Sequence, residues 1–266
     1  MRGRNPRRPA SDAAAVVASC SLLSRPGSVG PVGPVRLEAM LTVSKDLDWV
    51  GPLSFSPDGK NLAALGMVTA YLYDAVTHRQ KGTWRVRDTR RDAPTSLAFS
   101  PDGATLVVGN GAIGHGKDFG QIALWNIKRR TIRATYQSPD HGQVQAVTFS
   151  RDGALLAATG IRSIYLWQPA TGQSAGTLAG PQGAVVRDIA FSPDDRMLAA
   201  IFTNNAAYIW NLRTGKIVAV LPDPGNTEIA SLAYSPDGKT LAVGDFQSHV
   251  FLWDVSRTDQ PARSRP

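Results

Sequence analysis

The peptide Phe55-Ser-Pro-Asp-Gly59 decides how this sequence is read, because close variants of it occur four more times along the chain. The other copies begin at Phe99, Phe149, Phe191 and Tyr234, so neighbouring copies start 42 to 50 residues apart. A period of that length is typical of a repeat protein whose unit is a small group of secondary-structure elements. The sequence therefore predicts five copies of one structural unit.

A second landmark stays in phase with the first. An aromatic residue followed by a polar one stands at Tyr73, Trp125, Trp167, Trp210 and Trp253. After each of the first four of these, the next copy of the pentapeptide begins 24 to 26 residues later. Two markers that keep their phase over five copies indicate a true repeat rather than a chance similarity.

Each repeat has the pattern of four short strands. Residues 144–149 are β-rich and mostly apolar at both alternating sets of positions, which is typical of a strand buried on both sides. Ser-Pro-Asp-Gly then makes a tight turn, because proline presets φ and glycine accepts a left-handed backbone. Further strands are predicted at 155–159 and 163–168. A Thr-Gly turn at 171–172 leads to a fourth strand, as at 216–221 in the next repeat.

The repeat length, the Ser-Pro-Asp-Gly turn and the closing Trp253-Asp254 together resemble the WD40 repeat as it occurs in bacterial proteins. The resemblance covers residues 36–255 and implies an all-β fold, a WD40-type β-propeller of five four-stranded blades. It also implies that the aromatic residues of both landmarks pack between neighbouring blades. These structural residues are Phe55, Phe99, Phe149, Phe191, Tyr234, Tyr73, Trp125, Trp167, Trp210 and Trp253.

The repeats depart from the family's pattern at its polar positions. Members commonly carry Gly-His before the first strand and an Asp six residues before the Trp, which join a hydrogen-bond network to the Trp. This chain has Gly180-Pro181 in one of the first places, and Met67, Phe119, Ile161, Asn204 and Gln247 in the second. We therefore expect blade stability to rest on apolar packing, at roughly 3–5 kcal/mol for each fully buried Trp or Phe.

The two ends of the array are complementary in their strands. Residues 36–43 are strand-like and precede the first repeat, whereas the last repeat stops after its third strand at 251–255. In propellers of this family an N-terminal strand commonly completes the last blade, which removes two exposed edges. We expect five blades closed by such a latch. The family usually has seven blades, so an open arc, or a piece of a longer protein, stays an alternative.

Charge and composition divide the chain into three parts. The net charge of +8 comes from +5 in residues 1–36 and +2 in residues 256–266, which leaves +1 for the body. We expect residues 1–35 to be a disordered basic tail rich in Pro and Gly, residues 36–255 to be the propeller, and residues 256–266 to be a second tail. Because the basic charge is not clustered on a folded surface, nucleic-acid binding is not favoured.

The single cysteine bears on the compartment. Cys20 excludes an intrachain disulfide framework, and no apolar run is long enough to cross a bilayer. Val17-Ala18-Ser19-Cys20 resembles a lipoprotein cleavage box, but the apolar stretch before it is short and follows Asp12. We expect a cytoplasmic protein, with export as a lipoprotein through Cys20 as the alternative.

One loop is longer than the repeat requires. The second repeat carries an insertion within Gly109–Gly120, and its first residues spell Gly-x-Gly-x-x-Gly. On a strand-to-helix turn that motif would hold a dinucleotide, but here it lies between two predicted strands. We interpret it as an interaction loop, or as a passive insertion. With the other loops on the same face it gives a candidate partner-binding face, which comprises Asp48, Trp49, Arg90, Arg91, His115, Lys117, Asp118, Phe119, Arg162, Asn204, Asn205, Phe246 and Gln247.

The sequence favours a binding role over catalysis. The four His residues lie in separate repeats without metal-ligand spacing, and no nucleophile-elbow or phosphate-loop motif is present. We expect a protein-interaction scaffold or sensory module that uses no cofactor and binds a protein or peptide. Similar bacterial arrays form ends of signalling proteins, including Ser/Thr kinases, although this chain has no kinase motif. The alternatives are a propeller hydrolase or lyase with a site on the axis, or a fragment of a larger signalling protein.

Overall fold

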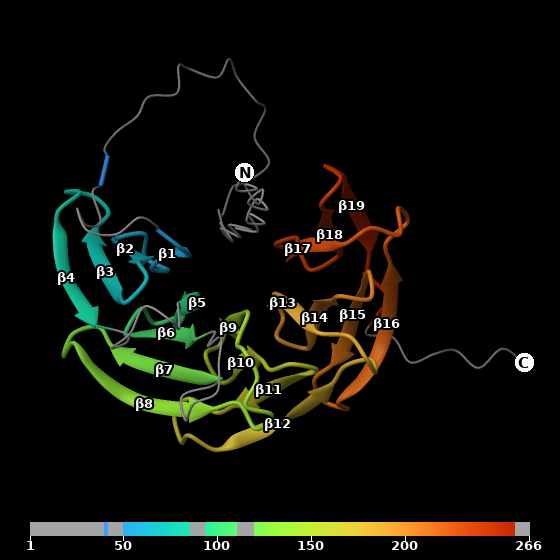
Figure 1. Cartoon of the computed structure of the whole chain (residues 1–266), viewed down its shortest axis with the longest axis horizontal. Helices are drawn as coiled ribbons and strands as arrows, with labels where there is room; N and C mark the ends of the chain where they lie inside the picture. Colours follow the sequence, from blue (N-terminus) through green and yellow to red (C-terminus); the bar gives the residue numbers. More distant parts are fainter. Residues whose placement is uncertain (1–39, 42–49, 86–93, 111–119, 259–266) are drawn as a thin grey trace, which may run out of the picture.

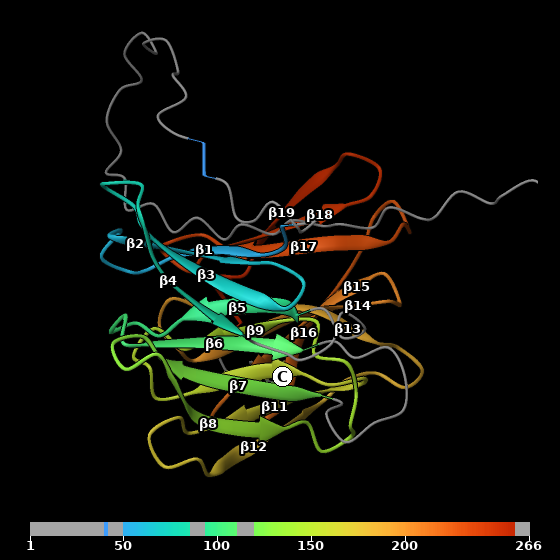
Figure 2. The ribbon, with the colours of Figure 1, turned by 60° about the vertical axis from the view of Figure 1, so that its left-hand side comes forward.

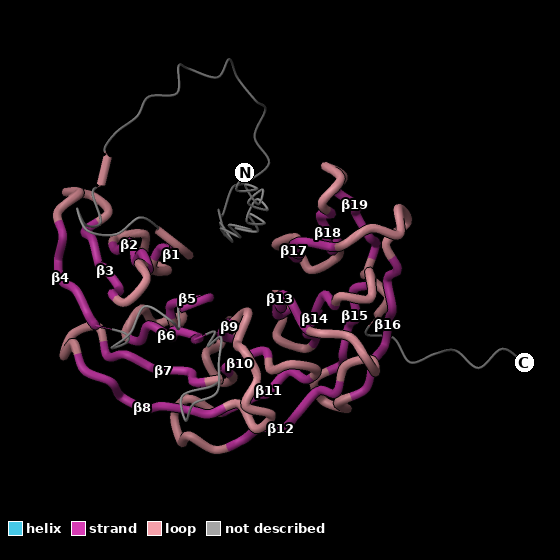
Figure 3. Tube along the Cα trace, in the orientation of Figure 1, coloured by secondary structure: helices cyan, strands magenta, loops and turns pink. Residues whose placement is uncertain are grey.

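The computed structural model describes residues 40–41, 50–85, 94–110 and 120–258, and in these ranges every regular element is a β-strand (Figure 3). The strands form five antiparallel sheets, each a meander of consecutive strands. The first sheet comprises β1 (Leu53–Phe55), β2 (Asn61–Leu65), β3 (Thr69–Asp74) and β4 (Gln80–Arg85). The second comprises β5 (Pro94–Phe99), β6 (Thr105–Asn110), β7 (Gln121–Asn126) and β8 (Thr131–Gln137).

The remaining sheets repeat the same order. The third comprises β9 (Val147–Phe149), β10 (Leu156–Thr159), β11 (Ser163–Trp167) and β12 (Ser174–Ala179). The fourth comprises β13 (Val186–Phe191), β14 (Met197–Phe202), β15 (Ala206–Asn211) and β16 (Lys216–Pro222). The fifth has three described strands, β17 (Ile229–Tyr234), β18 (Thr240–Asp245) and β19 (Val250–Asp254).

The sheets are arranged around an axis like the blades of a propeller. Figure 1 shows β1, β5, β9, β13 and β17 as the innermost strands, and these are the strands that end in the Phe or Tyr of the pentapeptide. The view in Figure 2 shows the first three sheets following one another along the arc. The prediction of repeated, radially packed sheets of the WD40 type is confirmed.

The described sheets form an open arc, and the closed ring favoured from the sequence is wrong. Figure 1 shows an opening between the first sheet and the fifth. Of the predicted latch strand, the structure describes only Met40 and Leu41; neither is in a strand, and the rest of residues 36–43 lies outside the described ranges. Leu41 packs on the first sheet, against the cluster of Ala64, Tyr71 and Tyr73. The fifth sheet therefore ends at β19 in the part of the chain that is described.

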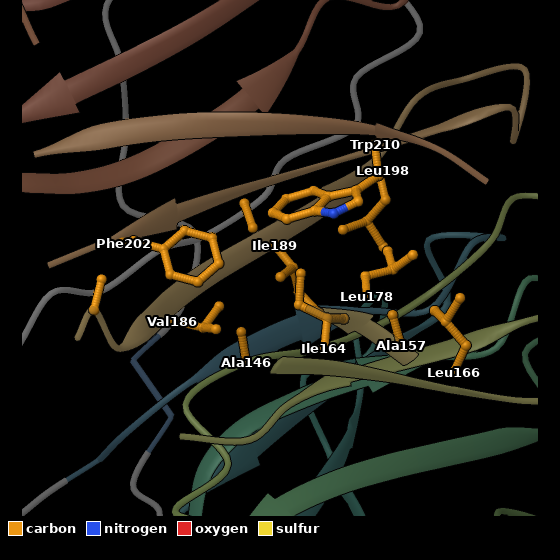
Figure 4. Close-up of a cluster of buried hydrophobic side chains, with 12 residues drawn as sticks. Ala146, Ala157, Ile164, Leu166, Leu178, Val186, Ile189, Leu198, Phe202 and Trp210 are labelled. Atoms are coloured by element: carbon orange, nitrogen blue, oxygen red, sulfur yellow. The ribbon is translucent and has the colours of Figure 1, made fainter. Parts of the chain in front are cut away.

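Apolar side chains between successive sheets make the core. Figure 4 shows the contact of the third and fourth sheets, where Ile164 and Leu178 face Ile189 and Trp210. Trp210 is almost fully buried, and its ring packs against that of Phe202 with centroids 5.9 Å apart. Such large buried side chains dominate the stability of a sheet-on-sheet contact.

All the aromatic landmarks except Phe55 are buried or partly buried. Phe99, Tyr73 and the Trp residues of the second, third and fourth sheets are buried, and Phe149, Phe191, Tyr234 and Trp253 are partly buried. Phe55 is the exception, because it lies on the side of the first sheet that faces the opening and is largely exposed. The predicted packing role of Phe55 is therefore not seen in this structure.

The five tight turns share one hydrogen-bond pattern. In the second repeat the Ser100 hydroxyl donates to Asp102 Oδ1 at 2.5 Å and accepts from the Thr105 N–H at 2.9 Å. Hydrogen bonds from the Ser100 hydroxyl and the Ala104 N–H hold the pKa of Asp102 below its ordinary value. Because this turn joins the innermost strand to the next one, it fixes the start of each blade.

Candidate interaction face

One edge of the arc collects two kinds of connection. Antiparallel order brings together the loop between the second and third strands of each sheet and the segment that enters the next sheet. In the last three sheets the inner loops are 160–162, 203–205 and 246–249. The connecting segments are 138–146, 180–185 and 223–228. We refer to these six segments as the loop face.

Backbone hydrogen bonds tie the loop face into a continuous frame. Arg162 C=O accepts from the Gly180 N–H at 3.0 Å, and Ile161 C=O accepts from the Val186 N–H at 3.1 Å. In the next sheets the Thr203 N–H donates to Val185 C=O at 3.0 Å, and the equivalent bond runs from Phe246 to Glu228 at 3.1 Å. The first two bonds link the loop of the third sheet to the start of the fourth, and the last two link a loop to the segment that enters its own sheet. The loops are therefore held in fixed relative positions.

Asp140 organises the start of this frame. Its carboxylate accepts hydrogen bonds from the Ser138 hydroxyl at 2.5 Å, the Gly142 N–H at 3.0 Å and the Ile161 N–H at 2.7 Å. Burial acts to raise the pKa of Asp140, but these hydrogen bonds outweigh it and hold the pKa below its ordinary value. The carboxylate is therefore ionised at neutral pH and has a structural role in joining two loops.

A second polar cluster lies in the last sheet. Thr227 Oγ1 lies 2.9 Å from Asp223 Oδ2 and 3.0 Å from Asp245 Oδ2, and His249 Nδ1 lies 2.9 Å from the same Asp245 oxygen. Burial acts to raise the pKa of Asp245, but hydrogen bonds from His249, Thr227 and Gln247 lower it to about 2. The His249 ring is more than half exposed, whereas the Asp245 side chain is enclosed. The His249 imidazole is thus exposed to solvent and is held in place by the enclosed Asp245 carboxylate.

The structure places five of the candidate partner-binding residues on the loop face. Arg162, Asn204, Phe246 and Gln247 are exposed, and Asn205 is partly buried. Asn205 adopts a left-handed backbone, φ 60°, and its side-chain amide donates to Asn226 C=O at 3.3 Å. Three consecutive sheets therefore each contribute at least one solvent-facing side chain to one edge of the arc.

The other candidates lie outside the described residues. These are Asp48, Trp49, Arg90, Arg91, His115, Lys117, Asp118 and Phe119. Gly109, the first glycine of the Gly-x-Gly-x-x-Gly stretch, lies in β6. A Cβ there would come within 2.7 Å of Val144 and 2.9 Å of Val147, so close packing of two sheets requires this glycine. The glycine thus has a packing reason that is independent of phosphate binding.

Sequence reasoning missed Asn110 as a polar residue of this edge. It is the last residue of β6 and is fully buried, yet neither amide atom has a hydrogen-bond partner within the described ranges. A buried amide without partners among the described residues is costly, so this position is a polar exception in an otherwise apolar strand end. Its sequence context, a strand end before an insertion, carries no signal that it would be buried.

Two further observations concern metals and membranes. In the described ranges no three His, Cys, Asp or Glu side chains gather as metal ligands would. The same ranges contain no helix long and apolar enough to cross a membrane.

Comparison with known protein families identifies two repeats in this chain. A family model described as WD domain, G-beta repeat matches residues 172–211 and 215–254. The first match covers β12 to β15 and the second β16 to β19, so each sequence repeat consists of the fourth strand of one sheet and three strands of the next. A search of curated proteins finds no match. Two adjacent matched repeats and sheets of the propeller type thus show that residues 172–254 are WD40 repeats.

Proposed function

We propose that this chain is a non-catalytic interaction module whose loop face binds a protein or peptide. WD40 repeats generally serve as protein-interaction scaffolds, which supports this class of role. The observation that carries the proposal is the frame of backbone hydrogen bonds, which holds exposed side chains of three consecutive sheets on one edge. A rigid support lowers the entropic cost of binding, because the contacting groups are already placed.

The exposed side chains on this face have the chemistry of a protein contact. Phe246 exposes about half of its surface, and Arg162 is exposed at the loop of the third sheet. Aromatic and arginine side chains are enriched among residues that dominate binding energy in protein interfaces.

The charges of the loop face favour protein over nucleic acid. Arg162 lies on the face together with Asp223 and Glu228. Next to the face, Arg187 of β13 forms an ion pair with Glu228, and Asp245 ends β18. A nucleic-acid surface needs a cluster of cations that neutralises several phosphates. A mixed surface of this kind instead suits a partner with charges of both signs.

The test is affinity capture with loop-face variants and matched variants on the opposite edge. Arg162→Glu is paired with Arg213→Glu, because Arg213 is equally exposed but lies in the turn between β15 and β16. Phe246→Ala is paired with Val76→Ala, in the exposed turn between β3 and β4. We expect the loop-face variants to lose the partners that the wild type and both controls recover, with affinity lowered by at least about tenfold at each hot spot.

The experiment can also refute the proposal. If all four variants recover the same partners as the wild type with equal affinity, the loop face is not the binding surface. A partner lost only from Arg213→Glu and Val76→Ala would place binding on the opposite edge.

A further inference from the structure

At every contact between neighbouring sheets, one sheet contributes one of its two sides and the next sheet contributes the opposite side. We call the side that faces the next sheet in sequence the forward side, and the side that faces the preceding sheet the backward side. At the contact of the fourth and fifth sheets, for example, Ala207 and Ile209 of β15 belong to the forward side and Leu232 and Leu241 to the backward side. Four such contacts occur along the arc, so the forward side of the fifth sheet and the backward side of the first have no equivalent neighbour among the described residues.

The forward side of the fifth sheet is apolar and exposed. Leu252, the residue before Trp253, is 71% exposed, whereas the residues at the same position in the other sheets are at most 5% exposed. Val250 is 69% exposed against at most 1% for its equivalents. Those buried equivalents are Leu72, Leu124, Leu166 and Ile209 for Leu252, and Ala70, Ile122, Ile164 and Ala207 for Val250. Two β-strand residues that a following sheet covers everywhere else are thus uncovered here.

The backward side of the first sheet shows the reciprocal exposure. Phe55 is 59% exposed and Leu53 is 41% exposed. The residues at the position of Leu53 in the other sheets are all buried, namely Leu97, Val147, Ile189 and Leu232. Leu41 packs against the cluster that contains Tyr71 and Tyr73 in β3, so the exposed part of this side is the inner strand.

Inner strands of neighbouring sheets are also joined by a hydrogen bond, and each end of the arc carries only one of the two groups that form it. At two interior contacts a side chain three residues before the landmark aromatic accepts from a backbone N–H of the next sheet. Ser96 Oγ accepts from Val147 at 2.9 Å, and Asp188 Oδ2 accepts from Leu232 at 3.4 Å. Ser231 stands at the acceptor position of the fifth sheet and Leu53 at the donor position of the first. Neither the Ser231 hydroxyl nor the Leu53 N–H has a hydrogen bond to another described residue.

The tight turns show the same relation. A Cβ at Gly153 would lie 3.5 Å from Pro101, and a Cβ at Gly238 would lie 3.4 Å from Pro193, so each turn rests on the proline of the preceding turn. Gly59, in the first turn, has nothing within 4 Å of its Cβ position. Pro236, in the last turn, is exposed. Each end therefore carries one half of the turn contact.

We propose that the chain associates head to tail with a second copy of itself, the forward side of β17–β19 in one copy packing on the backward side of β1–β4 in the other. The apolar residues, the hydrogen-bonding groups and the turns of the two ends are the two halves of a contact that the chain already makes four times. Within one copy the opening of the arc keeps these halves apart. A contact between unlike surfaces is heterologous, so it repeats from copy to copy. The proposal is independent of any partner on the loop face.

The test uses the full chain with one end blocked at a time. Leu252→Asp places a charge on the forward side of the last sheet, and Phe55→Asp places one on the backward side of the first. Both residues are largely exposed in the single copy, so both variants should fold, which circular dichroism checks. By analytical ultracentrifugation we expect the wild type to self-associate with rising concentration and each variant alone to stay monomeric.

Mixing the two variants gives the decisive result. Leu252→Asp keeps an intact backward side on its first sheet, and Phe55→Asp keeps an intact forward side on its fifth sheet. These two sides fit each other, so the mixture should form a one-to-one dimer that grows no further. The control Ile132→Asp changes an exposed apolar residue of the outer strand β8 and should self-associate like the wild type. A wild type that is monomeric at all concentrations, or a mixture that forms no dimer, would overturn the proposal.

The hydrogen bond provides a second, milder measurement. Ser231→Ala should weaken the association by about fivefold to tenfold, the effect of losing one hydrogen bond. Hydrogen exchange at the Leu53 amide should slow in the wild-type assembly relative to the Leu252→Asp monomer. Equal exchange at Leu53 in the assembly and the monomer would place the contact elsewhere and refute the head-to-tail geometry.

Discussion

Asp188 shows how one side chain on an inner strand both joins two sheets and costs stability. It lies on β13, where its Oδ2 accepts from the Leu232 N–H of the next sheet and its Oδ1 accepts from the Ile189 N–H at 2.9 Å. Burial raises the pKa of Asp188 to about 7, although the two hydrogen bonds act to lower it. The same position in the second sheet holds Ser96, whose hydroxyl makes the equivalent bond without a titratable group. The chain thus supplies its own uncharged alternative.

We predict that Asp188→Ser changes how the free energy of unfolding depends on pH. In the unfolded chain the pKa of Asp188 is about 3.9, whereas in the folded chain burial raises it to about 7. Raising the pH through this window therefore favours the unfolded wild type by about 1.4 kcal/mol for each unit of pKa displacement, and the loss is constant above it. The variant lacks this loss, so its free energy of unfolding relative to that of the wild type should increase from pH 4 to pH 7. These two pH values correspond to the pKa of Asp188 in the unfolded and in the folded chain.

Urea unfolding at both ends of the window measures the effect. Asp195→Ser is the control for loss of an aspartate next to the same strands, because Asp195 lies in the turn that joins β13 to β14. A stability difference between Asp188→Ser and the wild type that is the same at both pH values would show that folding does not raise the pKa of Asp188. The acceptor for Leu232 is kept by the serine, so loss of the inter-sheet bond does not confuse the comparison.

At the scale of one element, the third strand of each sheet supplies a large aromatic side chain near its end. Trp210, the residue before the last in β15, is almost fully buried between the third and fourth sheets, near Phe202 and Tyr208. Trp253 stands at the same position of β19 but is partly exposed, since no described fourth strand runs beside β19. The same residue in the same repeat position therefore has two different environments.

We predict that Trp210→Ala lowers the free energy of unfolding by about 3–5 kcal/mol, the usual effect of removing a fully buried large aromatic side chain. Trp253→Ala should cost clearly less, because part of its ring is already in contact with water. Chemical denaturation followed by circular dichroism measures both. Equal losses for the two variants would mean that Trp253 is covered in solution, as it would be if another strand paired with β19.

The strands could be predicted from the sequence because their signals are local. The turn chemistry of Ser-Pro-Asp-Gly and the alternation of 144–149 each depend on a few neighbouring residues, and the structure has strands and turns at those places. The innermost strand of the third sheet is shorter than predicted, Val147–Phe149, because the residues before it enter the loop face. Leu178 could be assigned to a strand, but nothing local shows that it packs on the following sheet.

At the scale of the whole molecule, ring closure could not be predicted, because it depends on the summed rotation of five sheets. Each repeat specifies its contact with the next one, and no residue specifies the angle that this contact leaves between sheets. The exposure of Phe55 and Leu252 follows from that angle and has no sequence signal, since their equivalents in the other repeats are of the same residue types. The loop face could be predicted because antiparallel order alone decides which connections share an edge.

An arc of sheets that contact only their neighbours should be least stable at its ends. In such proteins stability is approximately a sum of each repeat's own stability and its contacts with adjacent repeats, and an end repeat has one contact where an interior repeat has two. We predict that in the monomeric Leu252→Asp variant the amides of β10 and β14 exchange hydrogen slowest and those of β1 and β19 fastest. Native-state hydrogen exchange measures this gradient along the chain. Uniform protection from the first sheet to the fifth would contradict an open arc, because only a closed ring gives every sheet two neighbours.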